Sequence, residues 1–257
     1  WRMPLFMLLA GFFTALSLSK REVGNYALNR LIRLGVPILL LWAVLPAIDE
    51  GTSDIFKLPE LISWVLYDVP FKLRLDHLWF LYYLLIFYGA LLLLKRITPV
   101  VLTFITDYEL SLARILILWL PILILLSPVY KPTGGIFGDV PTVLGEVKLG
   151  SMLFMASFFL IGLQSQKSPR FLEQLKKKRF WLPSLIIFSF IPIGLLGWGG
   201  IKDEPFVLSS VLEMWIVNSL SGSAALFLVL SIMGFAMQQI SMGGKTLDWL
   251  VKLSYPI

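Results

Sequence analysis

Apolar residues occur along the chain in long blocks that short polar or charged connections separate. A helix needs about 20 mostly apolar residues to cross a bilayer, and fewer when flanking side chains reach the headgroups. Seven blocks approach this length, at residues 4–18, 34–48, 78–94, 112–129, 151–163, 180–197 and 211–237. The pattern predicts an all-α protein, a polytopic transmembrane helical bundle with about seven spans.

The last block is longer than one perpendicular span requires. It can form a tilted helix, a helix broken near SGS at residues 221–223, or two short segments. The blocks at 34–48 and 151–163 are short for free-standing spans. No internal repeat or soluble segment interrupts the blocks, so residues 1–257 are predicted to form one integral-membrane domain.

Positive charge alternates between successive connections. The loops 19–33, 95–111, 164–179 and 239–252, taken with the adjoining helix ends, carry 15 of the 22 Lys and Arg residues, and the other connections carry 7. Cytoplasmic loops of membrane proteins are richer in Lys and Arg. We therefore expect these four loops in the cytoplasm and the acidic loop at 49–76 outside it, in a multi-pass membrane protein.

Composition supports this class and excludes others. Hydrophobic residues make up 58% and charged residues 15%, with a mean hydropathy of +0.83, whereas soluble domains carry about 25% charged residues. The net charge of +6 is attributed to membrane orientation, and no nucleic-acid partner is expected. Without cysteine and with a single histidine, we expect no disulfide, no thiolate nucleophile and no dedicated metal site.

The single histidine, His77, lies in DHLWFLYYLLIFY at residues 76–88, where the acidic loop meets an apolar block. One interpretation places it in the aromatic collar of the membrane interface, where Trp and Tyr are enriched. The other makes it a functional group at the outer mouth of a membrane cavity. Asp76 does not decide between them, because adjacent helical residues do not share a face.

A stronger chemical signal is NYALNRLIRLGVP. Arg30 and Arg33 lie on one stripe with Tyr26 and Pro37 near the start of a helix that enters the membrane from the cytoplasm. Cations are disfavoured at the positive end of a helix dipole, so a bound polyanion such as phosphate is one explanation. Anchoring at the anionic membrane surface is the other.

Three segments in order, MPLFMLLAGFFTALSL, LNRLIRLGVP and HLWFLYYLL, resemble the membrane acyltransferase family often called acyltransferase family 3. Its usual pattern is P-L-F-F-x-x-S-G-F-F, then R-x-x-R-L-x-x-P, then H-L-W-F-L. The spacing and the acidic loop resemble the branch that contains glucan biosynthesis protein C. The closing LSYPI is similar to the start of the family's last motif, so we expect a fragment that lacks the first and last helices and is inactive alone.

The resemblance implies an O-acyltransferase that moves an acetyl or succinyl group from cytoplasmic acyl-CoA to a hydroxyl of an extracytoplasmic carbohydrate or glycan. Arg30 and Arg33 match the arginines associated with acyl-CoA, and His77 and Trp79 match the H-L-W motif on the acceptor side. The principal catalytic histidine is expected upstream of Trp1. The partners would be acyl-CoA, the glycan and the bilayer, with no tightly bound cofactor.

Other features carry weaker hypotheses. Gly11 and Phe12 match the S-G-F motif, but Ala10 replaces its serine, so no hydroxyl role survives there. Glu213, with Asn218, is a candidate for substrate-side support if it lies at membrane depth; otherwise it is solvated at the outer end. The basic LKKKRF at residues 175–180 is typical of a membrane surface. The glycine-rich TGGIFGD at 133–139 lacks the ending of a phosphate-binding loop.

Two functions from other classes stay open on the sequence alone. Short and proline-containing spans with a basic gate would also suit a transporter or flippase for a glycan or lipid. A non-catalytic partner subunit is the third possibility. Acyl transfer from acyl-CoA is the observation that separates the enzyme from both.

Overall fold

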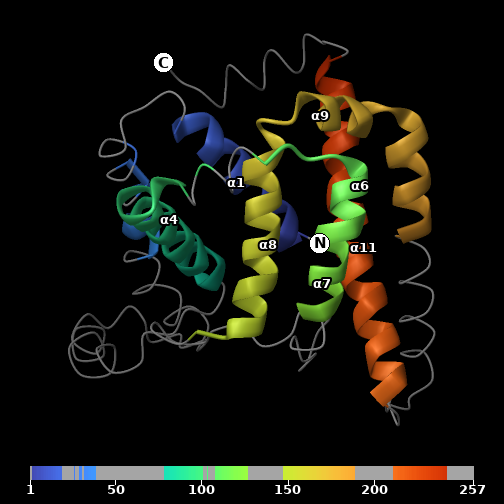
Figure 1. Ribbon diagram of the computed structural model, residues 1–257, viewed down its shortest axis with the longest axis horizontal. Coiled ribbons are helices and arrows are strands. Elements are labelled where there is room, and N and C mark those ends of the chain that lie inside the picture. Colours follow the sequence, from blue (N-terminus) through green and yellow to red (C-terminus); the bar gives the residue numbers. More distant parts are fainter. Residues whose placement is uncertain are drawn as a thin grey trace, which may run out of the picture. The chain divides into compact units, whose positions relative to one another are not determined.

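The computed structural model describes residues 2–18, 26, 29–30, 32–38, 78–100, 103, 108–126, 147–188 and 211–241. No β-strand occurs among them, in agreement with the predicted all-α class. The helices are α1 (Arg2–Leu18), α4 (Trp79–Ile97), α6 (Leu112–Arg114), the π-helix η4 (Ile115–Trp119), α7 (Leu120–Leu126), α8 (Leu149–Ser165), α9 (Pro169–Lys176) and α11 (Val211–Ser241) (Figure 1). Residues 32–38 and 178–188 are helical as well.

Within the described residues, two helical stretches, Trp79–Ile97 and Ser219–Gln239, are long and apolar enough to cross a membrane. A third is counted if Leu149–Ser165 and Pro169–Lys176, which meet at 104°, form one broken span. The helices Arg2–Leu18 and Leu112–Leu126 are apolar but shorter. Most of the block at 34–48 and half of that at 180–197 lie outside the described residues. The total of about seven spans therefore stays a prediction.

Helix α11 decides between the alternatives that the sequence left open for the last apolar block. It runs unbroken for 31 residues through the SGS sequence, so neither a break there nor two short segments occurs. Ser223 Oγ donates to the Ser219 carbonyl oxygen at 2.7 Å, which satisfies this hydroxyl inside the helix. At 1.5 Å per residue the helix is about 46 Å long, longer than a hydrocarbon core of about 30 Å. A tilt or an extension beyond the bilayer follows.

The segment 164–179 was expected to be a loop, but part of it is helical. It contains α9, an amphipathic helix whose Phe171 and Leu175 are buried while Arg170, Glu173 and Gln174 are exposed. Pro169 begins this helix, where a missing N–H costs nothing. The periodicity of a helix only two turns long is too short to be separated from that of a polar loop, which explains the error.

Two compact units are distinguished within the chain. One comprises Met7–Asp107 and Tyr130–Leu163, and the other comprises Trp1–Phe6, Tyr108–Val129 and Gln164–Ile257. In the second unit, α11 packs against α7 and α9, and Gly234 lets α11 approach the Leu175 carbonyl. The assignment of residues 1–257 to one domain stays a prediction.

In the first unit, α1 and α8 cross at two glycines. A Cβ atom added to Gly11 would overlap the Phe159 carbonyl group, and one added to Gly162 would overlap the Leu8 carbonyl group. Small residues at helix crossings let backbones touch, which is a main source of helix association in membranes. Gly11 of the A-G-F-F segment is therefore a packing residue.

The helix from Leu112 to Leu126 contains a π-helical turn directly before Pro121. Proline lacks an N–H group, and its ring clashes with the carbonyl four residues earlier. The chain widens instead, and the Leu120 N–H bonds to the Ile115 carbonyl oxygen five residues back. This turn exposes Ile117 and buries Trp119.

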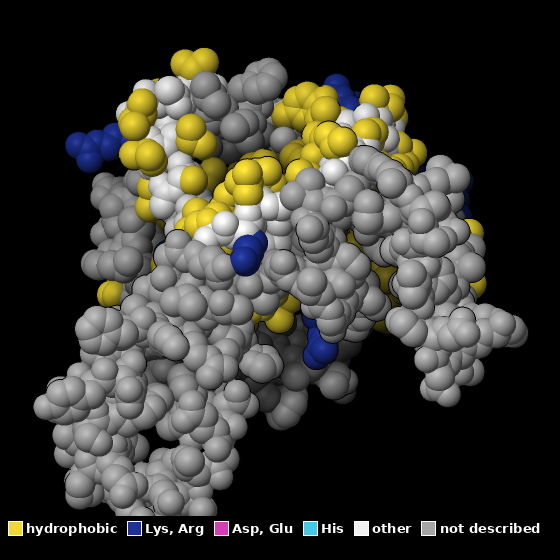
Figure 2. Space-filling view, turned by 90° about the horizontal axis from the view of Figure 1, so that it is seen from below, with side chains coloured by type: hydrophobic (Ala, Val, Ile, Leu, Met, Phe, Trp, Pro, Cys, Tyr) yellow, Lys and Arg dark blue, Asp and Glu magenta, His cyan; other side chains and the backbone are white. Residues whose placement is uncertain are grey.

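Large apolar side chains lie on the surface of several helices: Leu93 and Ile97 on α4, Ile117 in η4, Leu125 on α7 and Leu149 on α8. On the face shown in Figure 2, hydrophobic side chains form much of the described surface and Lys or Arg side chains stand singly. Exposed apolar area of this extent is unfavourable in water. The surface therefore fits contact with lipid.

Candidate functional site

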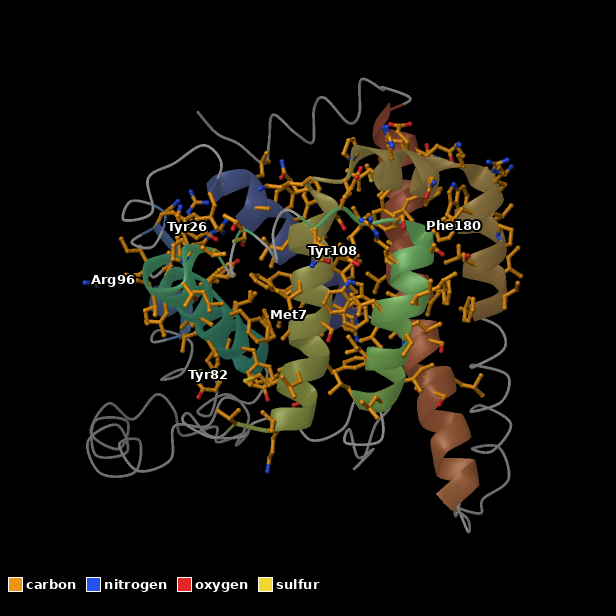
Figure 3. All side chains as sticks on the ribbon, viewed as in Figure 1. Met7, Tyr26, Tyr82, Arg96, Tyr108 and Phe180 are labelled. Carbon is orange, nitrogen blue, oxygen red and sulfur yellow. The ribbon has the colours of Figure 1, made fainter. Side chains whose placement is uncertain are left out.

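Arg30 lies in an aromatic site formed by two tyrosines. Its guanidinium carbon is 5.3 Å from the ring centroid of Tyr26 and 5.5 Å from that of Tyr88. Both distances are within the range of attractive cation–π contacts. The arginine is half-buried, and both tyrosines are buried. We call Arg30, Tyr26 and Tyr88 the arginine cage; Figure 3 labels Tyr26 beside α4, which supplies Tyr88.

Tyr26 is fixed from the side of α1. Its hydroxyl donates to Thr14 Oγ1 at 3.0 Å, and Thr14 Oγ1 donates to the Ala10 carbonyl oxygen at 2.6 Å. Burial raises the pKa of Tyr26, although its hydrogen bond with Thr14, and the positive charge of Arg30 and a hydrogen bond with it, act in the opposite direction. The phenol therefore stays neutral and keeps its proton as a donor. Ala10, where the family pattern has serine, takes part through its backbone only.

Tyr88 is fixed from the side of α8. Its ring meets Phe159 edge to face at 5.8 Å and Tyr26 edge to face at 6.1 Å. Phe87, the preceding residue, also packs on Phe159 at 5.4 Å. Because Phe159 lies at the crossing of α1 and α8, the cage is built beside this helix contact.

One nitrogen of the caged arginine has no partner. Arg30 Nε is buried and forms no hydrogen bond in the described part of the chain. Leaving a buried donor unsatisfied costs about 1–3 kcal/mol, and more for a charged group. Ring faces attract the positive charge but do not satisfy N–H groups that point along the guanidinium plane. A ligand oxygen of negative charge is the complement that such a group lacks.

Arg33 is placed differently. It is exposed, whereas Arg30 is half-buried. The shared helical stripe predicted from the sequence therefore does not give the two arginines the same surroundings. The sequence spacing carries no information on Tyr88, which comes from a helix more than fifty residues later, so this difference is visible only in the structure.

Trp79 begins α4 and is buried with 8% of its surface exposed. Its ring meets that of Tyr83 edge to face at 5.7 Å. Tyr83 is fully buried, its hydroxyl donates to the Lys148 carbonyl oxygen at 3.2 Å and it lies 3.0 Å from Ser151 Oγ. Tyr83 is therefore a core residue, and the start of α8 supplies the polar partner that its buried hydroxyl needs.

The side chains of two predicted site residues, His77 and Glu213, are not among those that the structure describes. His77 lies outside the described residues, directly before the single helical turn at Leu78. Glu213 lies in the first turn of α11, and Asn218 lies further along the same helix. The side chains of both are outside the described part. Among the described residues, no group of three or more His, Cys, Asp or Glu side chains is arranged to hold a metal ion.

A second buried polar cluster was missed by sequence analysis. Trp119 Nε1 donates to Gln164 Oε1 at 3.3 Å, the Leu110 N–H donates to Ser168 Oγ at 2.7 Å, and Ser168 Oγ donates to the Gln164 carbonyl oxygen at 2.9 Å. Each of these buried side chains is hydrogen-bonded, Trp119 to Gln164 and Ser168 to two backbone groups, as burial requires. The cluster ties the η4 turn to the bend before α9, which is a structural task. The polar pair Gln164–Ser165 at the end of an apolar block was its only signal.

Comparison with known families settles the class of protein. A family model described as Acyltransferase domain, that of acyltransferase family 3, matches residues 1–257, the whole of the chain. The chain belongs to acyltransferase family 3. Neither a curated protein nor a solved structure matches it.

The predicted family is thus confirmed, and with it the general class of membrane acyltransferase. The family favours the acyltransferase over the transporter, whereas the non-catalytic partner subunit stays an untested alternative. Arg30 of the arginine cage lies in the LNRLIRLGVP segment, one of the three segments on which the resemblance to this family rests.

Proposed function

We propose that this acyltransferase moves an acetyl or succinyl group from cytoplasmic acyl-CoA to a hydroxyl of an extracytoplasmic carbohydrate or glycan. The family membership supports the reaction class. The resemblance to the glucan biosynthesis branch supports the acceptor. The apolar helices and the 15-to-7 division of Lys and Arg support a multi-pass protein, with about seven spans in these residues, in a bacterial inner membrane.

The observation that carries the proposal is the state of Arg30. Its guanidinium is held half-buried between two rings, with a buried Nε that no described residue satisfies. Coenzyme A brings phosphate oxygens, which pair with guanidinium groups through strong, directional hydrogen bonds. Arg30 would hold one phosphate, and Arg33, which is exposed to solvent, would contact the donor as well.

The reaction itself needs a base and no redox partner. The acceptor hydroxyl oxygen attacks the thioester carbonyl carbon, the carbon–sulfur bond breaks, and the hydroxyl proton passes through the base to the departing sulfur of coenzyme A. The resemblance assigns that base to a histidine upstream of Trp1. His77 would lie on the acceptor side, with Trp79 and Glu213 as supporting residues. No tightly bound cofactor or metal takes part.

The test uses the full-length protein in sealed vesicles with acetyl-CoA and succinyl-CoA, each carrying a labelled acyl group, on the cytoplasmic side. The expected result is label on carbohydrate at the opposite face, with one coenzyme A thiol released for each group transferred. Intact thioester together with translocated glycan would contradict the proposal in favour of transport.

A further inference from the structure

Two tyrosines restrict the orientation of the Arg30 guanidinium. Tyr26 lies four residues before it in the sequence, and Tyr88 comes from α4. We propose that both are positioning residues, which fix the Arg30 guanidinium toward a phosphate oxygen of the donor. This inference rests on the proposed donor site and adds to it: the two arginines have different tasks, and Tyr88 sets the affinity of one of them.

An unrestrained arginine binds an anion at an entropic cost, because its long side chain must be fixed in one rotamer. The cage fixes it before the ligand arrives. Rings at 5.3 and 5.5 Å restrict the guanidinium, and the rings themselves are held by Thr14 and Phe159. Arg33 is exposed, so its side chain keeps its rotamer freedom. Fixing it on the donor costs more conformational entropy, and its contact contributes less affinity.

A purely structural arginine would have its donors paired within the protein. In the described residues Arg30 forms no ion pair, and its Nε is left buried without an acceptor. Tyr26 directs its hydroxyl proton to Thr14. The cage thus stabilises the charge of Arg30 through two rings and leaves its buried Nε–H without an acceptor in the described residues, which is the arrangement expected of a site that awaits an oxyanion.

The experiment measures the dissociation constant of coenzyme A for the full-length protein in nanodiscs by calorimetry. Tyr88→Leu removes the ring and should weaken binding about tenfold, the equivalent of about 1.4 kcal/mol. Tyr88→Phe keeps the ring face and should bind nearly as the unmodified protein does. Tyr82→Leu is the matched control, a half-buried tyrosine of the same helix outside the cage, and should leave the constant unchanged.

Pentafluorophenylalanine at position 88 provides a variant of nearly unchanged shape, in case Tyr88→Leu fails to fold. Fluorination reverses the charge distribution of the ring face, so affinity should fall well below that of Tyr88→Phe. A merely structural ring would not give this difference. Equal affinities of the two ring variants would overturn the positioning role.

Failure of the inference is distinguishable from failure of the donor site. If Arg30→Ala weakens coenzyme A binding and Tyr88→Leu does not, the donor site stands and the positioning role of Tyr88 is overturned. If Arg30→Ala itself binds coenzyme A as the unmodified protein does, the proposed donor site fails and the inference fails with it.

Discussion

Individual residues of this acyltransferase acquire their tasks from partners distant in the chain. Arg30 and Arg33 are equivalent in the sequence motif, but only Arg30 meets Tyr88 of α4. Gly11 belongs to a motif that invites a chemical interpretation, yet its neighbours are the backbone atoms of α8. Motif spacing indicated the candidate residues, and the contacts show that Gly11 packs against backbone whereas Arg30 lies against an aromatic ring.

We predict that Gly11→Ala destabilises the protein by about 1–3 kcal/mol, the usual cost of overpacking. The added methyl would overlap the Phe159 carbonyl group and force α1 away from α8. The midpoint of thermal unfolding in detergent measures the effect. Gly89→Ala is the control, because a Cβ there meets nothing within 4 Å and alanine favours a helix. Equal midpoints for the two variants would contradict the crossing.

His77 lies outside the described residues, so its place on the acceptor side stays a prediction from the sequence. We expect its ring to face inward. His77→Phe keeps bulk and interfacial character while removing both ring nitrogens. We expect at least about a tenfold loss of acyl transfer at normal membrane levels, equivalent to about 1.4 kcal/mol of transition-state stabilisation. Transfer rates of the full-length enzyme with labelled acyl-CoA measure it. Full activity would return His77 to the interfacial collar.

At the scale of elements, the long apolar blocks predicted helices where the structure describes them. A long apolar segment in a bilayer must satisfy its backbone N–H and C=O groups internally, and a helix does this. The continuity of α11 was one of three alternatives that the sequence left open. Two finer features were not predictable: the π-helical turn depends on how the chain relieves Pro121, and α9 is too short for its periodicity to be recognised.

The buried polar cluster changes how topology should be tested. Ser168 lies in the predicted cytoplasmic loop, but its side chain is fully buried and bonded to the Leu110 N–H, so a cysteine there would label poorly from either side. Gln174 of α9 is exposed. In the cysteine-free chain, we predict that Gln174→Cys reacts with an impermeant maleimide only after the cytoplasmic face is opened.

The control for this labelling is Gly135→Cys, in the loop predicted to be extracytoplasmic, which should react in intact cells. Reaction of Gln174→Cys in intact cells, at a rate similar to Gly135→Cys, would contradict the orientation. Each outcome is measured as the fraction of protein that carries the mass tag on a gel. This fraction does not depend on expression level.

For the molecule as a whole, the sequence was sufficient for the class of protein. Composition required a membrane, and three ordered motifs indicated the family that residues 1–257 match. The candidate site was predicted only in part: Arg30 was found, while Tyr88 and Thr14 were not. Their involvement follows from the way three segments far apart in sequence pack together, which local spacing does not encode.

The central claim is that Arg30 binds the acyl donor. The most direct measurement is the dissociation constant of coenzyme A for Arg30→Lys in the full-length protein, compared with Arg96→Lys at the exposed end of α4. Lysine keeps the charge but loses the guanidinium fork. We predict that Arg30→Lys weakens binding about tenfold or more and that Arg96→Lys leaves it unchanged. Equal constants for both variants and the unmodified protein would contradict the account.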